Sequence, residues 1–395
     1  MATHHDILIV GAGTAGITVA AQLLLKDSSL DIAIIDPSDT HYYQPIWTLV
    51  GGGVFDREFS ARPQAEVIPS GATWIKDAVK TFAPDKNAIT TTSGKDYTYN
   101  YLVVAAGLQL DWDKIDGLKG NMGKNGICSN YSYDTVTSTW KTLQNLNGGR
   151  AIFTMPPMPI KCAGAPQKIM WLTDHWLRKQ GRRDNTEVLF NTTGGAIFGI
   201  AKYRAALEKL VEQRDIKTLF EHNLVAVDAA KKEAVFEHMT TKEQQKYAYD
   251  MLHVVPPQSS PDFIKKSPLA NDAGWVDVHK YTTQHVTYKN VFSLGDCSSL
   301  PNSKTGAAIR KQAPVTVENL LATRNNLDLE ASYNGYASCP LVTGYGRLIL
   351  AEFDYDGQPC ESFPFNQAQE RYSMYALKAY GLPEMYWNGM LKGHV

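Results

Sequence analysis

The sequence has little net charge, no long apolar run and few cysteines. Its 39 Lys and Arg oppose 40 Asp and Glu, leaving a formal net charge of −1. This balance points neither to nucleic acid nor to an electrostatic membrane anchor. No apolar run is long enough to span a bilayer, and there is no low-complexity tract or solenoid-length repeat. Five cysteines without paired short spacings argue against a disulfide framework and a CxxC zinc site, so we expect no bound metal.

The length and apolar content predict more than one domain. With 395 residues, 44% of them hydrophobic, the chain can bury a large core. The first strand follows residues 1–6 almost at once, so we expect no signal or transit peptide before the fold.

A dinucleotide-binding fingerprint, Gly11-Ala-Gly13-Thr-Ala-Gly16, lies near the start of the chain. An apolar run precedes it and a helix-like run follows. The first two glycines permit a tight turn and close approach of the backbone to a pyrophosphate at the helix N-terminus, and the third allows close helix–strand packing. Asp36 ends the next apolar run, where an acid binds a ribose hydroxyl. This pattern favours FAD or NAD over glycines that merely form a turn.

Two later segments favour FAD over NAD. Residues 101–107 form an apolar run that ends in the small residues Ala106 and Gly107, and residues 290–296 repeat the pattern and end in Gly295-Asp296. The chain resembles two-domain flavoprotein reductases, in which the first turn passes close to the dinucleotide and the Gly-Asp carboxylate faces the ribityl hydroxyls. An N-cap role for Asp296 is compatible with this function.

The middle of the chain repeats the strand and turn without a regular fingerprint. Residues 187–190 form a good strand, but the following Asn191-Thr-Thr-Gly194-Gly195-Ala-Ile-Phe198-Gly199 lacks the glycine spacing. We expect Phe198 to crowd an approaching pyrophosphate. The fold is therefore predicted to be duplicated with its second nucleotide site lost, which disfavours NAD(P)H as the electron donor.

Two cysteines lie in settings that favour chemistry over packing. Cys162 opens a predicted helix between Lys161 and Lys168, where a thiol pKa falls. Cys339 lies in a second turn-like segment, Ala-Ser-Cys-Pro. Cys128 is a third candidate of uncertain role. Cys297 is expected to be a buried packing residue, and Cys360 lies in a polar loop without an activating partner.

Several motifs resemble those of sulfide:quinone oxidoreductases, closest to the branch found in mitochondria and some bacteria. They are residues 161–168, 42–51 and 338–345. The resemblance covers nearly the whole chain and includes residues 251–257 and 348–355.

This resemblance implies a flavoprotein with FAD as its cofactor and a redox pair of Cys162 and Cys339, joined at rest by a disulfide or another sulfur bridge. Hydrosulfide would attack Cys162, leave a persulfide there and release Cys339, the cysteine nearest the flavin, as a thiolate. Two electrons would pass through the flavin to a membrane quinone. The sulfur would pass to sulfite, glutathione or another sulfide. Cys128, unusual in this branch, either assists sulfur release or is an incidental substitution.

Charge and aromatic patterns add further expectations. Lys168 either holds anionic sulfur or faces water, and Lys304 either stabilises the reduced flavin from a helix start or is solvated. Residues 367–380 are predicted to form a helix that ends at 381–383. The aromatic tail after it is expected to lie in a membrane interface, with ordinary core or a dimer contact as the alternative. The expected quinone-channel residues are Tyr42, Pro45, Trp47 and Phe365.

The sequence therefore predicts an α/β protein with two interleaved Rossmann-like domains and a C-terminal membrane-associating helical segment. Residues 1–110 and 290–330 form the FAD-binding domain, 150–255 the degenerate second domain, and 335–395 the cysteine, membrane and quinone segment. The expected FAD-binding residues are Gly11, Gly13, Gly16, Asp36, Gln44, Val79, Ala106, Gly107, Gly295, Asp296 and Lys304.

The expected enzyme is a peripheral protein of a bacterial cytoplasmic membrane or of the mitochondrial inner membrane, and a homo-oligomer is compatible with the sequence. One alternative is an NAD(P)H-dependent flavoprotein such as a type II NADH dehydrogenase or a coenzyme A disulfide reductase. Another is a flavin redox sensor without turnover.

Overall fold

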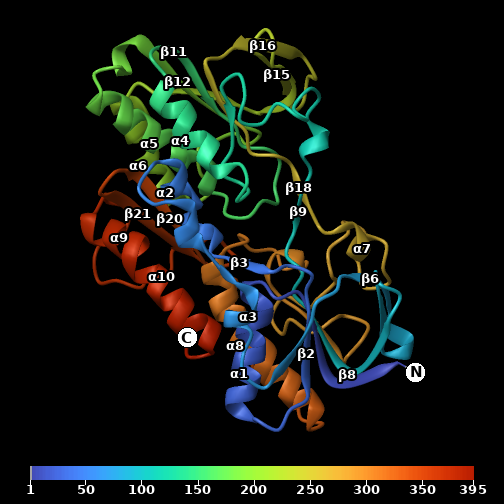
Figure 1. Cartoon of the computed structure of the whole chain (residues 1–395). Coiled ribbons are helices and arrows are strands. Elements are labelled where there is room, and N and C mark those ends of the chain that lie inside the picture. The colour runs from blue at the N-terminus through green and yellow to red at the C-terminus, as the bar shows by residue number, and fades with distance from the viewer. Residues whose placement is uncertain (1) are drawn as a thin grey trace.

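The computed structural model describes residues 2–395 and folds into two α/β lobes (Figure 1). The short antiparallel pair β9 (Gln109–Leu110) and β18 (Gln258–Ser259) joins them. The chain therefore leaves the first lobe, builds the second and returns, so that the lobes are interleaved in sequence.

The first lobe is built on a seven-stranded sheet in the order β5-β2-β1-β8-β7-β6, with β19 beside the end of β8. Its apolar strands are buried on both faces, as in parallel α/β sheets. The strands are β1 (Thr3–Val10), β2 (Ile32–Ile35), β5 (Ala72–Ile75), β6 (Val79–Ala83), β7 (Ala88–Thr91), β8 (Asp96–Val104) and β19 (Val291–Ser293). The helices α1 (Thr14–Lys26) and α8 (Gly306–Arg324) pack together against it.

Short elements complete the first lobe. The strands β3 (Thr40–Tyr42) and β4 (Ala61–Pro63) form an antiparallel pair. The short helices are α2 (Trp47–Gly51), α3 (Gln64–Val67) and α7 (Asp262–Lys265). Helix α2 reaches the other lobe and packs against its helices α4 (Val136–Asn145) and α5 (Ala165–Lys179).

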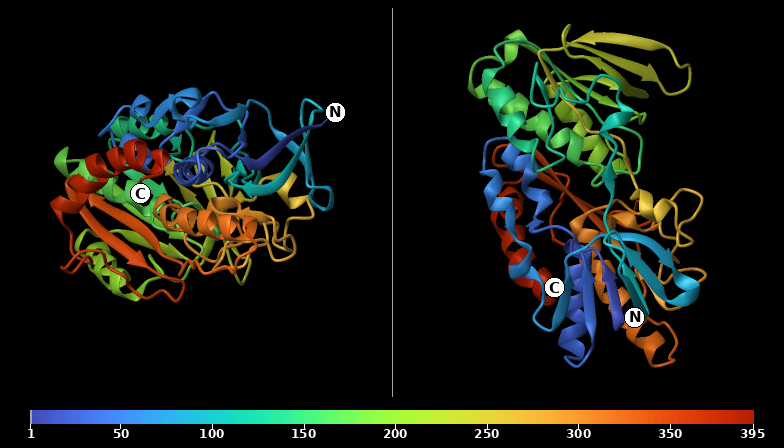
Figure 2. Two further views of the ribbon diagram at one scale, coloured as in Figure 1. Left: turned by 90° about the horizontal axis from the view of Figure 1, so that it is seen from below. Right: turned by 45° about the vertical axis from the view of Figure 1, so that its right-hand side comes forward.

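The second lobe has a five-stranded parallel sheet in the order β10-β17-β11-β12-β13. These strands are β10 (Ile127–Cys128), β11 (Gly149–Phe153), β12 (Thr186–Thr192), β13 (Lys217–Phe220) and β17 (Met251–His253). Its helices are α4 (Val136–Asn145), α5 (Ala165–Lys179) and α6 (Ala201–Gln213). An antiparallel sheet lies at the far end (Figure 2) and contains β14 (His222–Asp228), β15 (Glu233–His238) and β16 (Gln244–Ala248).

The last part of the chain returns between the lobes as a hairpin, β20 (Ala337–Gly344) and β21 (Arg347–Phe353), with β20 packed on α5. A helical segment follows. It begins at α9 (Tyr372–Ala376), continues through α10 (Leu382–Glu384) and ends at Lys392 beside α1. Among residues 2–395, no helix combines the length and apolar character needed to cross a membrane.

The predicted bounds of this C-terminal helix, 367–380, were wrong at both ends. The helix starts at Tyr372 and passes through Gly381 and Pro383, because two π-helical stretches flank α10 and Pro383 lies in the first turn of that short helix. In a first turn the missing N–H of proline costs little.

The expectation for the aromatic tail was also wrong. Tyr386, Trp387, Met390 and Leu391 are at most 3% exposed and belong to the main core. The tail is therefore part of the core, which was the alternative reading.

Candidate functional site

The turn between β1 and α1 leaves space only where a ligand would need it. Gly11 has φ +104°, and a Cβ there would lie 2.5 Å from the carbonyl oxygen of Ala105. A Cβ on Gly16 would lie 1.9 Å from the Gly11 oxygen. At Gly13, by contrast, a Cβ would meet no protein atom within 4 Å. The first and third glycines are thus required by the fold, whereas the second leaves room for a phosphate at the N-terminus of α1.

Asp36 holds this turn from the end of β2. Its Oδ2 accepts a hydrogen bond from the Ala12 N–H at 2.7 Å, and its Oδ1 accepts one from the Ser38 N–H at 2.8 Å. Burial raises the pKa of its carboxyl. Asp36 therefore lies beside the fingerprint, and its ribose contact stays a prediction.

Among the predicted flavin-binding residues, Asp296 gives the clearest indication of a bound ligand. Its carboxyl is partly exposed, burial raises its pKa, and Lys304 and Lys161 oppose that shift. Within residues 2–395 its carboxylate accepts no hydrogen bond. Gly107, with φ +68°, would place a Cβ in open space. The Asp296 carboxylate after β19, which accepts no hydrogen bond within residues 2–395, and the open turn at Gly107 after β8 fit a flavin dinucleotide with hydroxyl groups to donate.

The other predicted cofactor residues have varied surroundings. Lys304 is buried rather than solvated: its Nζ donates to the Ser298 oxygen at 3.0 Å and lies 4.3 Å from the Trp275 ring. The next residues start α8, as predicted. Ala106 follows β8, whereas Val79 lies in the apolar core at the start of β6.

Two cysteines separated widely in sequence meet at the interface of α5 and β20. The Cys162 Sγ lies 3.7 Å from the Cys339 Sγ, and Lys168 Nζ donates to the Cys162 Sγ at 3.4 Å. Cys162 precedes α5 with φ +85°, a strained value for a residue with a side chain. Cys339 lies in strand β20 rather than in the predicted turn, because Ala337–Gly344 pairs with β21.

The two thiols differ in exposure and in pKa. Cys162 is partly exposed, whereas Cys339 is fully buried. The hydrogen bond from Cys339 lowers the pKa of Cys162 to about 5, and the Lys168 charge adds to that effect. The same partner and burial raise the pKa of Cys339. Lys168 is 4% exposed, so it does not face water.

No sequence pattern indicated a second buried cation at the pair. Lys378, on the C-terminal segment, is 2% exposed and donates from Nζ to the Pro45 oxygen at 2.7 Å. Burial and the charge of Lys168 lower its pKa to about 7, and the charge of Cys162 opposes the shift. Its motif is an ordinary helix sequence, and only tertiary packing brings it here.

Lys161 connects the cysteine pair to the predicted quinone wall. Its Nζ donates to Gln44 Oε1 at 2.8 Å and to the Tyr131 oxygen at 3.1 Å, and it lies 5.2 Å from the Trp47 ring. Burial lowers its pKa to about 8. The sequence identified Lys161 only as a neighbour of Cys162.

The structure groups three of the four predicted quinone residues. Tyr42 ends β3, Pro45 lies in the short 3-10 turn that follows and Trp47 begins α2, with the Tyr42 and Trp47 rings 6.1 Å apart. Phe365 instead stacks on Phe363 at 5.3 Å and lies 4.3 Å from the Arg371 guanidinium.

The remaining cysteines are poor nucleophiles. Cys128 is fully buried in β10, and burial raises its pKa to about 12. Cys297 is fully buried and its thiol donates to the Val104 oxygen at 3.4 Å. Burial raises the pKa of Cys360 to about 11. All three are therefore neutral thiols at pH 7, which favours packing over sulfur transfer for Cys128.

The turn after β12 differs from the first fingerprint. Residues 193–200 separate β12 from α6, whereas only residues 11–13 separate β1 from α1. Phe198 is 5% exposed and packs on Phe353, with the rings 6.1 Å apart. In the second lobe, this turn therefore contributes Phe198 to the packing of the core.

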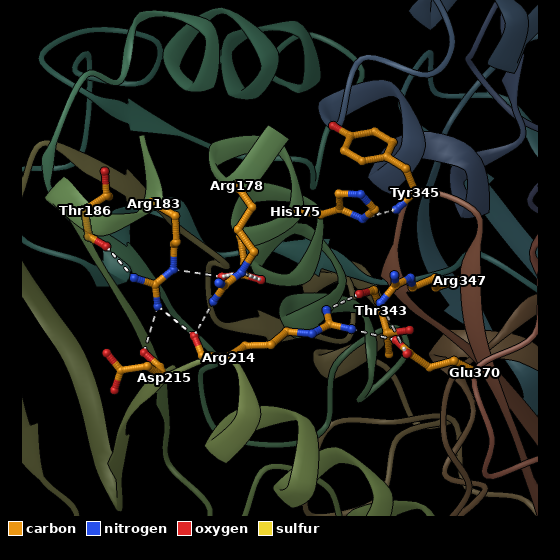
Figure 3. Close-up of polar contacts among 11 residues, drawn as sticks. His175, Arg178, Arg183, Thr186, Arg214, Asp215, Thr343, Tyr345, Arg347 and Glu370 are labelled. Atoms are coloured by element: carbon orange, nitrogen blue, oxygen red, sulfur yellow. Dashed lines mark hydrogen bonds and ion pairs between the residues drawn. The ribbon is translucent and has the colours of Figure 1, made fainter. Parts of the chain in front are cut away.

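A cluster of arginines fastens the β20–β21 hairpin to the second lobe (Figure 3). The Arg214 guanidinium donates to the Thr343 oxygen at 2.5 Å and to Glu370 Oε1 at 2.7 Å. Its own carbonyl accepts from Arg178 at 2.8 Å and from Arg183 at 2.9 Å. Because Thr343 lies on β20, this cluster positions the strand that carries the buried cysteine.

Comparison with known proteins places these features in context. The model of the pyridine nucleotide-disulphide oxidoreductase family matches residues 5–141. The chain is 48% identical to the mitochondrial sulfide:quinone oxidoreductase of Mus musculus over 99% of this chain and 87% of that protein. It is 50% identical to the mitochondrial sulfide:quinone oxidoreductase of Dictyostelium discoideum over 98% of this chain and 86% of that protein. The crystal structure of the sulfide:quinone oxidoreductase from Aquifex aeolicus has the same fold, with a TM-score of 0.83 at 23% identity over 98% of this chain and 92% of that one.

Proposed function

This chain belongs to the sulfide:quinone oxidoreductase family, and from that premise we propose that it oxidises hydrogen sulfide and passes the electrons to a membrane quinone. The observation that carries the proposal is the contact between Cys162 and Cys339, whose sulfurs lie 3.7 Å apart with a lysine at 3.4 Å from the first. A dithiol with one partly exposed and one fully buried sulfur, whose charge acts on Asp296 of the predicted flavin turn, suits the oxidation of sulfide.

The reaction starts with the pair oxidised to a disulfide, whose S–S bond is about 2.05 Å long. Hydrosulfide attacks the Cys162 sulfur, which is the exposed member of the pair. The new S–S bond makes a persulfide on Cys162, and the electron pair of the old bond leaves with Cys339 as a thiolate. When bound, the flavin supplies the two-electron acceptor for this thiolate.

The persulfide sulfur then passes to a small acceptor, for which sulfite, glutathione and sulfide are the candidates. Lys168 lies beside Cys162, and the amine of Lys378, whose pKa is lowered to about 7, adds a second positive charge near this sulfur when it is protonated. Two cations at one sulfur favour anionic sulfur species over neutral ones. We therefore assign sulfur transfer to the Cys162 side of the pair and electron transfer to the Cys339 side.

We propose FAD as the flavin, because its adenosine ribose and pyrophosphate match Asp36 and the β1–α1 turn. Residues 1–110 and 290–330 would form its domain, 150–255 the degenerate second domain and 335–395 the segment for cysteine, quinone and membrane. The residues that would hold it are Gly11, Gly13, Gly16, Asp36, Ala106, Gly107, Gly295, Asp296 and Lys304.

For the quinone we propose the site at Tyr42 and Pro45, over the buried Trp47, which adjoins Lys161 and Lys378. A lipid-soluble quinone places the enzyme at a membrane, either the mitochondrial inner membrane or a bacterial cytoplasmic membrane. Peripheral attachment would use exposed aromatic side chains rather than a spanning helix.

An anaerobic titration of the flavin absorbance tests the proposal. Sulfide is expected to bleach the flavin and a soluble quinone to restore it, whereas NADH is expected to do neither. Cys162→Ser and Cys339→Ser should each abolish bleaching by sulfide while retaining the flavin. Cys360→Ser is the matched control. Bleaching by NADH alone would contradict the proposal and favour an NAD(P)H-dependent flavoprotein.

A further inference from the structure

The C-terminal segment reaches the β1–α1 turn through a buried tyrosine, Tyr386. This residue is 3% exposed and lies in the π-helical stretch Met385–Gly389. Its hydroxyl oxygen lies 2.9 Å from Thr14 Oγ1 and 2.5 Å from His41 Nε2. Thr14 is the first residue of α1 and directly follows Gly13. A side chain from the end of the chain is thus bonded to the start of the fingerprint helix.

His41, on β3, continues this contact to the backbone of the turn. It is 3% exposed, and its Nδ1 lies 3.1 Å from the carbonyl oxygen of Ala12. Because a carbonyl oxygen only accepts, Nδ1 must carry the hydrogen. Burial lowers the pKa of His41 to about 4, so the ring is neutral at pH 7 and its Nε2 is an acceptor. The Tyr386 hydroxyl therefore donates to His41 and accepts from Thr14.

The peptide group between Ala12 and Gly13 is held from several sides. Gln64 Nε2 donates to the same Ala12 oxygen at 3.0 Å, and the Asp36 carboxylate accepts the Ala12 N–H at 2.7 Å. The C=O of Ala12 and the N–H of Gly13 belong to one planar trans peptide group, so they point in opposite directions. Fixing the oxygen on His41 and Gln64 therefore fixes the Gly13 N–H on the opposite side.

The Gly13 N–H is the group that this arrangement presents to a ligand. Within residues 2–395 it donates to no protein acceptor, and a Cβ on Gly13 would meet no protein atom within 4 Å. Unpaired N–H groups at a helix N-terminus are the donors that bind phosphate. A donor that is fixed before binding loses less freedom when the ligand arrives, which raises the affinity.

We propose that His41 and Tyr386 are positioning residues for the pyrophosphate of the flavin, so that the C-terminal segment contributes to the affinity for the cofactor. The inference rests on the proposed function, which assigns FAD to this turn. His41 acts through the Ala12 carbonyl, and Tyr386 acts through His41 and Thr14. Neither side chain needs to touch the ligand, because the Gly13 N–H is the group that binds it.

Tyr386→Phe tests this role because it removes one oxygen and retains the ring, which packs on Tyr43 with the centroids 4.5 Å apart. Flavin fluorescence titration of the flavin-free protein measures the dissociation constant of FAD. We expect it to rise about 5- to 10-fold, the effect of losing one neutral hydrogen bond or slightly more. ADP carries the adenosine and pyrophosphate without the isoalloxazine ring, so calorimetric titration with ADP should show a loss of the same size.

The matched control is Tyr203→Phe in α6. Tyr203 is fully buried, and its hydroxyl donates to Glu361 Oε1 at 3.1 Å and accepts from the Glu352 N–H at 3.2 Å. These contacts join the second lobe to the C-terminal hairpin and the loop after it, away from the β1–α1 turn. Tyr203→Phe should lower the free energy of unfolding in urea at least as much as Tyr386→Phe, because one lost partner is charged. Both dissociation constants should stay unchanged.

Two variants of His41 separate positioning from packing. His41→Leu removes the donor to Ala12, whereas His41→Asn offers an amide N–H near the Nδ1 position. His41→Asn should therefore bind FAD and ADP more tightly than His41→Leu.

Three results would overturn the proposal: unchanged affinities in Tyr386→Phe, an equal loss of affinity in Tyr203→Phe, or equal binding by the two His41 variants. The proposed function fails separately. If sulfide does not reduce the FAD that the wild type binds, the proposed function falls, while the FAD and ADP dissociation constants still test His41 and Tyr386.

Discussion

Cys162 and Cys339 carry the same thiol, yet their surroundings move the two pKa values in opposite directions. In the reduced pair the negative charge rests on the partly exposed Cys162, because Cys339 donates a hydrogen bond to it and the charge of Lys168 adds to that effect. The position of Lys168 on the first turns of α5 made this half of the site predictable from sequence. The partner cysteine was predictable only through family resemblance, because no local pattern relates β20 to α5.

The low pKa of Cys162 leads to a pH prediction. In the reduced protein, alkylation of Cys162 should have a midpoint near pH 5 and proceed at full rate above it, because only the thiolate reacts. Lys168→Met should raise this midpoint by at least one pH unit, since removing a nearby cation disfavours the anion. Mass spectrometry of quenched samples measures both. Lys179→Met, an exposed change on the same helix, is the control, and an equal shift there would contradict the assignment.

The β1–α1 turn separates the glycines that the protein needs from the one that a ligand needs. Gly16→Ala is expected to destabilise the flavin-free protein, because its Cβ would lie 1.9 Å from the Gly11 oxygen. Gly13→Ala should leave the stability of that form nearly unchanged and weaken flavin binding, because its Cβ would enter open space. Urea unfolding of the flavin-free proteins and flavin fluorescence titration give the two values. Equal effects of both changes on stability would contradict this division.

The hairpin β20–β21 could not be predicted from the sequence. The strands that precede the glycine turns could be predicted from their apolar runs, because strands of a parallel sheet are buried on both faces. The segment 337–344 carries Pro340 and small residues, which indicated a turn, but pairing with β21 overrides that local preference. The tail residues 386–391 were misplaced for the same reason, since an amphipathic aromatic segment fits a core groove and a membrane interface equally well.

The arginine cluster at this hairpin makes a testable contribution to stability. Arg214→Met removes the donor to Thr343. Among residues 2–395 it leaves Glu370, 24% exposed at its side chain, with Arg347 at 3.7 Å as its one remaining ion-pair partner. We expect a loss of about 3 kcal/mol in the free energy of unfolding, typical of breaking a largely buried ion pair. Urea unfolding measures it. Arg204→Met, whose ion pair with Glu208 is exposed, should lose less than about 1 kcal/mol.

Two of the molecule's exposed aromatic side chains, Phe59 and Tyr380, lie close together beside the C-terminal helix. Phe55 stacks on Phe59 at 4.7 Å and lies 5.9 Å from the Tyr380 ring. Phe59 and Tyr380 are 44% and 57% exposed. Residues from the start of the chain and from its C-terminal helix thus form one aromatic surface, near the Pro45–Lys378 contact. This arrangement fits peripheral attachment beside the quinone surface.

This surface leads to a prediction for membrane binding. Burying one aromatic side chain contributes about 2–3 kcal/mol, so the double variant Phe59→Ser/Tyr380→Ser should bind phosphatidylcholine vesicles at least about tenfold more weakly in sedimentation. Because the net charge is −1, binding should depend little on salt. Activity with a water-soluble quinone should persist, while activity with a long-chain quinone in vesicles should fall. Leu327→Ser removes an equally exposed apolar side chain, 65% exposed, in the loop after α8. If Leu327→Ser weakened vesicle binding as much as the double variant, attachment through this aromatic surface would be wrong.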